Sequence, residues 1–522
     1  MPLPVASSTL TRRPSSKTSP SSDRLLAISA SPHSVLRPEN THPMASAPHA
    51  DQVTPEPESG DTAAPAKRPR APPIITEVEI RTEFAHHDGA VSRINNGTFG
   101  CCPASVLASR SRWQRLFLSQ LDAFYFCSLQ PGLARSRAAV ALAVGAGVDP
   151  SEVSLVDNAT TAAAIVMQHV AWSFAEGRFS RGDAVLMLHY TYSSVKKSIH
   201  AYAARAGATV VEVPLPFPVA SPSAVAAEFR AALAVAKDGG RRAVRLAVID
   251  HITSMPSVLI PVKELVAICR EEGVDKVFVD AAHAIGQVPI DVRDIGADFY
   301  TSNLHKWFFC PSRGLPPHPQ GRPHRLAAPP PRRVQRSAWI GVRDYSAQLV
   351  VPDAVDFMAR FEGGIEGISR RNHDKVVEMG MMLAEAWGTF LGAPPEMCGS
   401  MAMIGLPGCL GIDSDEDAMR VRDMLRNDFK VEVPIFHNSR GVEGKEMDKD
   451  AKGDEVTGYV RISHQVYNVR EEYEVLRDAV NKLVLDGFTC AKLRPSGKCG
   501  TADLLLLGLL PKPYASITLH EG

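Results

Sequence analysis

The 522-residue chain is 45% hydrophobic and 22% charged, a balance typical of a globular protein with room for about two to four domains. Its 57 Lys and Arg residues equal its 57 Asp and Glu residues, so the composition indicates neither a nucleic-acid partner nor attraction to a membrane surface. No apolar run approaches the roughly 18 residues of a membrane span, and the nine cysteines form no C-x-x-C pair, so neither a metal site nor a disulfide framework is expected.

Residues 1–72 are rich in Ser, Pro, Ala and Thr and lack a periodic apolar pattern, which predicts disorder. Before Glu39 the only acid is Asp23, against five basic residues: Arg12, Arg13, Lys17, Arg24 and Arg37. An acid-poor, Ser- and Arg-rich start predicts an organellar transit peptide, for the chloroplast first and the mitochondrion as the alternative. A start of translation at Met44 would instead leave the protein in the cytoplasm.

Folded sequence is expected from residue 73. The segment Ile94–Gly100 reads INNGTFG and predicts a strand end that runs into a turn. Val153–Asp157 reads as a strand, and a helical run from Ala162 to Phe174 follows it. The intervening Thr160 and Thr161 could place hydroxyls and backbone N–H groups around a phosphate, although Thr is also a common N-cap residue.

Two further apolar runs, Asp183–Leu188 and Leu246–Asp250, read as strands, and Pro261–Arg270 has apolar residues at helical spacing. Strands and helices therefore alternate from Val153 to Thr301, which predicts a doubly wound, mostly parallel sheet. Ligands of such sheets lie at the carboxyl ends of the strands.

The stretch from Val277 to Trp307 carries the strongest chemical signal. A strand is predicted to end at Asp280 and a second, Asp298–Thr301, to precede Lys306. An enzyme that uses pyridoxal phosphate (PLP) needs such a pair, because the lysine amine forms an imine with the cofactor aldehyde and the carboxylate keeps the ring nitrogen protonated. Either residue alone would more often be an ordinary surface group.

The sequence Asp280-Ala-Ala-His283, followed by TSNLHKW, resembles the class V aminotransferase family of fold type I PLP enzymes. Within that family, NLHKWFFCP and RDYSAQLVVP most resemble the plant L-cysteine desulfhydrases and the isopenicillin N epimerase-like branch. The resemblance covers residues 75–487. It implies an α/β fold with a large PLP-binding domain, residues 73–350, whose doubly wound sheet is mostly parallel, and a smaller α+β domain, residues 351–487.

The resemblance also implies roles for individual residues. Lys306 would be the catalytic lysine, and Asp280 would pair with the ring nitrogen. The cofactor phosphate would be held by residues from two segments: Ala159, Thr160, Thr161, Asn303 and His305. Tyr192 would lie on the cofactor ring, with His189 or Tyr190 as alternatives at that position, and the ring oxygen side would be contacted by Ser254 and His283.

A substrate carboxylate would be bound by Arg461, which lies in the predicted strand Tyr459–Ser463 and whose planar fork matches a carboxylate. An edge-strand salt bridge is the alternative for this arginine. Asn96 would lie at the substrate mouth, and an ordinary Asn-Gly turn is the alternative there.

The sequence departs from the family in two places. Pro311–Arg336 carries eight prolines where the family continues with a strand, which indicates a local frame shift or a disordered insertion beside the cofactor site. Val342 stands where the family commonly has a Thr that reaches the phosphate of the neighbouring subunit. Both departures raise the alternative of a catalytically inactive family member.

The expected activity is that of an L-cysteine desulfhydrase, which converts L-cysteine and water to hydrogen sulfide, pyruvate and ammonia. Pro434–Gly453 contains no Cys that could accept the sulfur as a persulfide, so the sulfur should leave as hydrosulfide. A cysteine desulfurase and an epimerase-like enzyme are the alternatives. The resemblance further implies a homodimer with no membrane or nucleic-acid partner, and residues 488–522 fit no part of the family and are expected to form a divergent tail.

Overall fold

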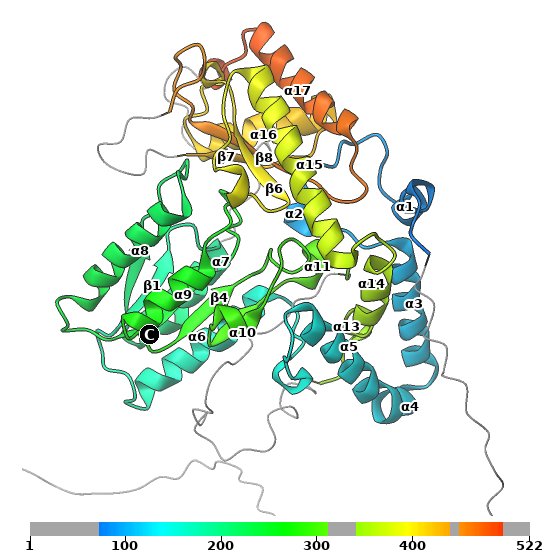
Figure 1. Cartoon of the computed structure of the whole chain (residues 1–522), viewed down its shortest axis with the longest axis vertical. Helices are drawn as coiled ribbons and strands as arrows, with labels where there is room; N and C mark the ends of the chain where they lie inside the picture. Colours follow the sequence, from blue (N-terminus) through cyan, green and yellow to red (C-terminus); the bar gives the residue numbers. More distant parts are fainter. Residues whose placement is uncertain (1–72, 312–340, 439–447, 494–522) are drawn as a thin grey trace, which may run out of the picture. The chain divides into compact units, whose positions relative to one another are not determined.

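The computed structural model describes residues 73–311, 341–438 and 448–493 (Figure 1). The predicted transit peptide, the Arg- and Pro-rich block after Pro311 and the tail from residue 494 onward lie outside the described residues.

A five-stranded sheet in which all strands are parallel forms the centre of the fold. Its spatial order is β2-β1-β3-β4-β5, and its strands are β1 Ala184–Leu188, β2 Thr209–Val213, β3 Val244–Asp250, β4 Val277–Asp280 and β5 Phe299–Thr301. The predicted parallel sheet is confirmed, and four of these strands lie where the apolar runs predicted them. Such runs mark parallel strands well because both of their faces are buried.

Successive side chains of each strand point to opposite faces of the sheet. In β1, Val185 and Met187 pack with the helix α6, Ala159–Ala175, whereas Leu186 and Leu188 belong to the core on the other face. Helices α7 (Ser193–Ser198) and η3 (Ile199–Ala204) lie beside α6, and α8 (Pro222–Lys237) and α9 (Val262–Glu271) cover the opposite face (Figure 1). The sheet is therefore doubly wound.

The predicted strand Val153–Asp157 is wrong. These residues follow the short helix η2, Pro150–Glu152, as an extended segment with no ladder to any described strand. Leu155 is buried, but its carbonyl oxygen accepts a bond from the side-chain amide of Gln348, at 3.2 Å. A strand exists only if a neighbour pairs with it, and none of the described strands pairs with this segment. The block where the family continues with a strand lies within residues 312–340, outside the described part.

The second sheet is antiparallel, with the order β6-β8-β7. Its strands and the helices packed around it are β6 Met401–Gly405, β7 Ile435–His437, β8 Gly458–Ser463, α15 Gly364–Trp387, α16 Asp415–Phe429 and α17 Arg470–Leu485. The prediction of a small α+β part is therefore confirmed. The domain boundary at residue 350 stays a prediction.

The remaining helices and helical turns, in chain order, are α1 Glu77–Glu83, α2 Asn96–Phe99, α3 Ala104–Ser119, α4 Leu121–Ala123, η1 Phe124–Ser128, α5 Leu129–Ala143, α10 Val292–Ile295, α11 Leu304–Trp307, α13 Ser346–Leu349, α14 Val351–Met358, η4 Pro395–Met397, η5 Gly408–Leu410 and η6 Cys490–Leu493. The strand end expected in Ile94–Gly100 is instead extended chain leading into the helical turn α2. None of the helices in the described ranges is long and apolar enough to cross a membrane.

Candidate active site

Three ionisable side chains gather at the carboxyl ends of the parallel strands. Asp250 ends β3 and is the register partner of Asp280, which ends β4, while Asp280 is in turn the partner of Thr301, the last residue of β5. Helix α11 begins three residues later and carries Lys306. Because parallel strands all end at the same edge of the sheet, the acid and the lysine predicted from the sequence lie at one site.

The amine of Lys306 is held inside the protein without a carboxylate partner among the described residues. Its Nζ lies 2.8 Å from Nε2 of His283. Burial, reinforced by the charge of Arg461 and opposed by that of Asp280, lowers the pKa of Lys306 from 10.5 to about 7. A substantial fraction of the amine is therefore neutral at physiological pH, as a nucleophile or a proton acceptor must be.

His283 lies in the turn after β4 and is 2% exposed. Burial, and next the charge of Lys306, keeps its pKa well below the usual value, so the imidazole is neutral. Its Nδ1 is buried and has no hydrogen-bond partner in the described part of the chain. A buried polar atom without a partner is costly, so a ligand bound at this position would satisfy it.

Two glycines let the backbone approach the lysine helix closely. Gly286 lies in the same turn as His283 with φ +81°, and a Cβ there would lie 2.3 Å from the carbonyl oxygen of Trp307. Gly100 has φ +73°, and its Cβ would lie 1.7 Å from the carbonyl oxygen of His305. Only glycine fits either position, so the two close approaches fix where the helix that carries Lys306 lies.

Asp250 and Asp280 form a buried pair of carboxyl groups, 2% and 3% exposed. Asp280 accepts a bond from the N–H of Ala282, at 3.1 Å, and Asp250 accepts one from the hydroxyl of Thr191, at 2.8 Å. Burial raises the pKa of both groups, and the charge of Asp280 raises that of Asp250 further. A cationic group bound here would stabilise the ionised form of Asp280.

The start of α6 lies next to the lysine helix. The N–H of Ala159 donates to the side-chain oxygen of Asn303, at 3.0 Å, which joins the two segments. Asn158 is the N-cap and accepts bonds from the N–H and the hydroxyl of Thr161, at 2.8 and 3.2 Å. The alternative of a Thr N-cap is therefore wrong. Of the predicted phosphate ligands, Ala159 and Asn303 are in contact, Thr160 is half-buried at the helix start, and His305 is half-buried in α11.

Arg461 lies in β8 and is 3% exposed. It donates to the carbonyl oxygen of Ser254, at 2.7 Å, and to the side chains of Asn95 and Thr98, at 3.0 and 2.5 Å. All three acceptors are neutral, so the predicted edge salt bridge is not what holds this arginine among the described residues. Burial lowers its pKa to about 10, yet it remains a cation at neutral pH.

Asn96 is fully buried, and its side chain is engaged within the protein. Its amide donates to the carbonyl oxygen of Lys306, at 2.9 Å, and its oxygen accepts from the hydroxyl of Tyr467, at 3.2 Å. These contacts make Asn96 a tie between α2 and the lysine helix. Its predicted contact with substrate stays a prediction.

The residue on the cofactor ring stays open between three candidates. Tyr192 is 46% exposed, precedes α7 and donates its backbone N–H to Asp250, so it lies at the correct edge of the sheet. The ring of His189 is engaged with Glu212, at 3.1 Å, and Tyr190 is partly buried against the main core. The side chain of Ser254 is half-buried near the same edge.

Sequence reasoning missed three residues of this site. Asp250 carried the same signal as Asp280, an acid that ends an apolar run, and could have been found. Asn95 and Thr98 had no such signal, because their contact with Arg461 spans 366 and 363 positions of the chain.

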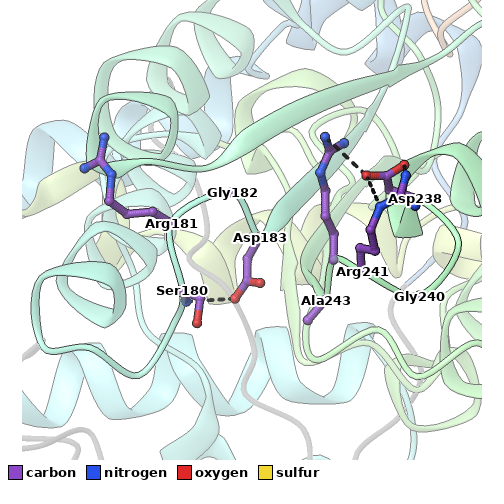
Figure 2. A pocket seen from close by; sticks show the side chains of 9 residues that line it. Ser180, Arg181, Gly182, Asp183, Asp238, Gly240, Arg241 and Ala243 are labelled. Carbon is purple, nitrogen blue, oxygen red and sulfur yellow. Dashed lines mark hydrogen bonds and ion pairs between the residues drawn. The ribbon is translucent and has the colours of Figure 1, made fainter.

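A separate cleft of about 570 Å³ lies at the opposite edge of the sheet, before the first residues of β1 and β3 (Figure 2). Both acids in its lining are paired: Asp238 with Arg241, at 2.5 Å, and Asp183 with Arg245, at 2.6 Å. We assign it no function. Among the described residues there is also no cluster of three or more His, Cys, Asp or Glu side chains that could hold a metal ion.

Comparison with known proteins identifies the family. The model of the family "Aminotransferase class-V" matches residues 129–314. A rice protein (Oryza sativa subsp. japonica) named "Putative L-cysteine desulfhydrase 2" is 74% identical over 448 residues, which cover 83% of this chain and 93% of the rice protein. The chain belongs to the class V aminotransferase family. The resemblance seen in the sequence is thus confirmed.

Two further proteins resemble this member of the class V aminotransferase family. An Arabidopsis thaliana protein named "Probable L-cysteine desulfhydrase, chloroplastic" is 54% identical over 439 residues, covering 82% of this chain and 90% of its own. The solved structure titled as a complex between "the cystine C-S lyase C-DES" and cysteine persulfide superposes with a TM-score of 0.56 at 18% identity, covering 75% of this chain and 97% of that one. That likeness supports the fold alone.

Proposed function

We propose that this class V aminotransferase is a PLP-dependent L-cysteine desulfhydrase that converts L-cysteine and water to hydrogen sulfide, pyruvate and ammonia. The observation that carries the proposal is the buried amine of Lys306, which lies against His283 at the strand edge that Asp280 closes. Relatives that are 54% to 74% identical over most of the chain and carry the name L-cysteine desulfhydrase support the choice of reaction.

The residues at the strand edge fit PLP. The Nδ1 atom of His283 is buried without a partner, and Asp280 is a buried acid without a cation bonded to it among the described residues. The residues that would hold the cofactor are Lys306, Asp280, His283, Ala159, Thr160, Thr161, Asn303, His305, Tyr192 and Ser254. When bound, PLP supplies an electron sink that stabilises negative charge on the substrate α-carbon.

The roles of the protein groups follow from their protonation states. Arg461 binds the substrate carboxylate, and the neutral Nζ of Lys306 accepts the proton from the α-carbon. With PLP bound, the carboxylate of Asp280 would hold the proton on the ring nitrogen. The β-thiolate leaves as hydrosulfide because Pro434–Gly453 contains no cysteine to accept the sulfur. Water then releases pyruvate and ammonia from the remaining fragment.

The proposal is tested by the visible absorbance of the purified protein, as wild type and as Lys306→Ala, before and after addition of L-cysteine. We expect a cofactor band in the wild type that is lost or displaced in the variant, with sulfide and pyruvate released in equal amounts by the wild type. A folded wild-type protein that binds no PLP would sink the proposal and favour an inactive family member. Protein-bound persulfide in place of free sulfide would favour a desulfurase.

We also propose that residues 1–72 direct the protein to the chloroplast. Their acid-poor, Ser-rich composition supports this, as does the word "chloroplastic" in the name of the Arabidopsis relative. A fluorescent protein fused after residue 72 should accumulate in chloroplasts, and its appearance in mitochondria or cytoplasm would refute the assignment.

A homodimer is proposed from the family resemblance. Exposed aromatic side chains, Phe99 at 75% and Trp172 at 60%, are compatible with a protein contact. Light scattering should give twice the chain mass at micromolar concentration, and a monomer with full activity would contradict the proposal.

A further inference from the structure

The environment of Arg461 has an unusual charge balance. Its guanidinium is almost fully buried, and the acceptors recorded for it are the Ser254 carbonyl, the Asn95 side-chain amide and the Thr98 hydroxyl. Its Nε atom is buried with no hydrogen-bond partner in the described part of the chain. Arg461 takes part in no ion pair among the described residues, and, after burial, the charged group that lowers its pKa is another cation, Arg422.

Buried arginines are normally paired, because an uncompensated charge away from water is costly. Here neutral oxygens fix the orientation of the planar fork without neutralising its charge. Asn95 and Thr98 are themselves bonded to each other, at 2.6 Å, and Asn95 is 6% exposed, so the two acceptors form one rigid unit. An anion that reaches the guanidinium would provide the missing countercharge.

The same short segment also reaches the catalytic lysine. Asn96 donates to the backbone of Lys306, and Gly100 packs directly on the backbone of His305. The segment from Asn95 to Gly100 therefore sets both the direction of Arg461 and its separation from the Lys306 amine.

We propose that Asn95 and Thr98 are positioning residues that give the site its specificity for substrates with a carboxylate, because they orient Arg461 through neutral oxygens and leave its charge to the substrate. The proposal deepens the proposed function and rests on it. An acid at position 95 would neutralise the charge of the Arg461 guanidinium and so remove its attraction for the substrate carboxylate.

The decisive variant is Asn95→Asp, which keeps the acceptor oxygen and adds a negative charge. We expect the dissociation constant of L-cysteine, measured from the absorbance change of the bound cofactor, to rise about tenfold to a hundredfold. Cysteamine has the same thiol and amine without the carboxylate, and its dissociation constant should hardly change. The melting temperature should be kept or raised, since the variant completes an ion pair with Arg461, whereas a merely structural role for Asn95 predicts a lower one.

Thr98 supplies an independent test. Thr98→Val removes the hydroxyl that accepts from Arg461, and we expect a higher KM for L-cysteine with a smaller change in kcat. Thr98→Ser keeps the hydroxyl and should restore the wild-type KM. Asn427→Asp, at an exposed position near the end of α16, is the matched control for an added charge and should change neither constant.

The proposal would be overturned by an Asn95→Asp protein that still prefers L-cysteine to cysteamine as strongly as the wild type does. If that variant does not fold, the Thr98 variants test the proposal. A wild-type KM for L-cysteine in Thr98→Val, or a raised KM that Thr98→Ser shares, would then overturn it. Failure of the proposed function is seen separately, because a wild type without cofactor absorbance can still be titrated by calorimetry. Cofactor-free wild type should bind 3-mercaptopropionate, which has a carboxylate but no amine, and Asn95→Asp should not.

Discussion

Burial of Lys306 lowers the pKa of its amine, which makes the amine reactive, and it also lowers the stability of the folded protein. Its amine lies against neutral His283 rather than against a carboxylate, so the folded protein disfavours its charged form. The pKa of about 7 in the folded chain lies below the ordinary 10.5. Below pH 7 the lysine is therefore charged in both states, and the folded state alone bears the cost of burying that charge.

Replacement of Lys306 by Met in the cofactor-free protein should consequently stabilise the fold. The expected gain is about 1 to 4 kcal/mol below pH 7, because loss of the bond to His283 offsets part of it. Between pH 7 and 10.5 the folded-state lysine is mostly neutral while the unfolded-state lysine still binds its proton, so the gain should shrink as pH rises and disappear near pH 10.5. Urea unfolding at pH 6, 8 and 10 measures this dependence.

The matched control is Lys263→Met, which removes a largely exposed lysine paired with Asp294. An exposed ion pair contributes about 0 to 1 kcal/mol, so this change should have a small effect with no comparable loss between pH 7 and 10. A Lys306→Met gain that is independent of pH would contradict the lowered pKa.

At the scale of elements, the sequence predicted those site residues that directly follow the carboxyl end of a buried strand. The ends of β4 and β5 were predictable, because apolar runs buried on both faces are distinct in sequence and the residues that follow them are forced to one edge. The failed strand at Val153–Asp157 shows the limit of this reasoning. A strand needs a hydrogen-bonded neighbour, and a run of apolar residues does not say whether one is available.

The contacts of the substrate arginine mark a second limit. Arg461 was predicted from the resemblance of its strand to the family, but its orientation depends on Asn95, which is 366 positions away and lies in a segment with no apolar periodicity. Asn96 was chosen from the same turn, and the described contacts of its side chain are with the Lys306 carbonyl oxygen and the Tyr467 hydroxyl, while its contact with substrate stays a prediction. Neighbouring positions of a turn point in different directions, so a one-residue choice there requires the tertiary structure.

The glycine at position 100 provides a prediction for the lysine helix. Gly100→Ala should destabilise the protein by more than about 3 kcal/mol and lower cofactor affinity, because the new Cβ would overlap the carbonyl of His305 and push the helix that carries Lys306. Gly147→Ala is the control: it has a similar φ of +77°, but nothing lies within 4 Å of its Cβ. It should cost only the backbone strain, about 1 kcal/mol.

Chemical denaturation and PLP titration of both variants distinguish the cost of backbone strain, which both share, from the cost of overlap with His305, which only Gly100→Ala has. Equal losses in Gly100→Ala and Gly147→Ala would mean that the close approach to His305 is not required.

At the scale of the whole molecule, the site combines residues from distant parts of the chain. Asn95 precedes the parallel sheet, Lys306 follows its last described strand, and Arg461 belongs to the antiparallel sheet. The protein must therefore fold both sheets together before any of the proposed chemistry is available. The N-terminal helix contributes to this assembly, because the ring of Phe84 contacts those of Phe309 and Tyr467 at centroid distances of 6.2 and 4.9 Å.

These contacts indicate the first residues of the chain that the fold requires. The backbone N–H of Ile75 donates to the carbonyl of Arg360, at 2.8 Å, and Ile75 is 7% exposed. A chain that lacks residues 1–72 should keep the melting temperature of the full chain within about 2 °C, because every buried side chain of α1 remains.

A chain that also lacks residues 73–84 should melt several degrees lower. It loses Ile80 and Phe84, which are 6% and 4% exposed, and each such loss from a core costs about 2 to 5 kcal/mol. Differential scanning calorimetry of the three chains tests this directly. Equal destabilisation by both truncations would show that residues 1–72 are part of the folded unit, which would argue against their role as a removable transit peptide.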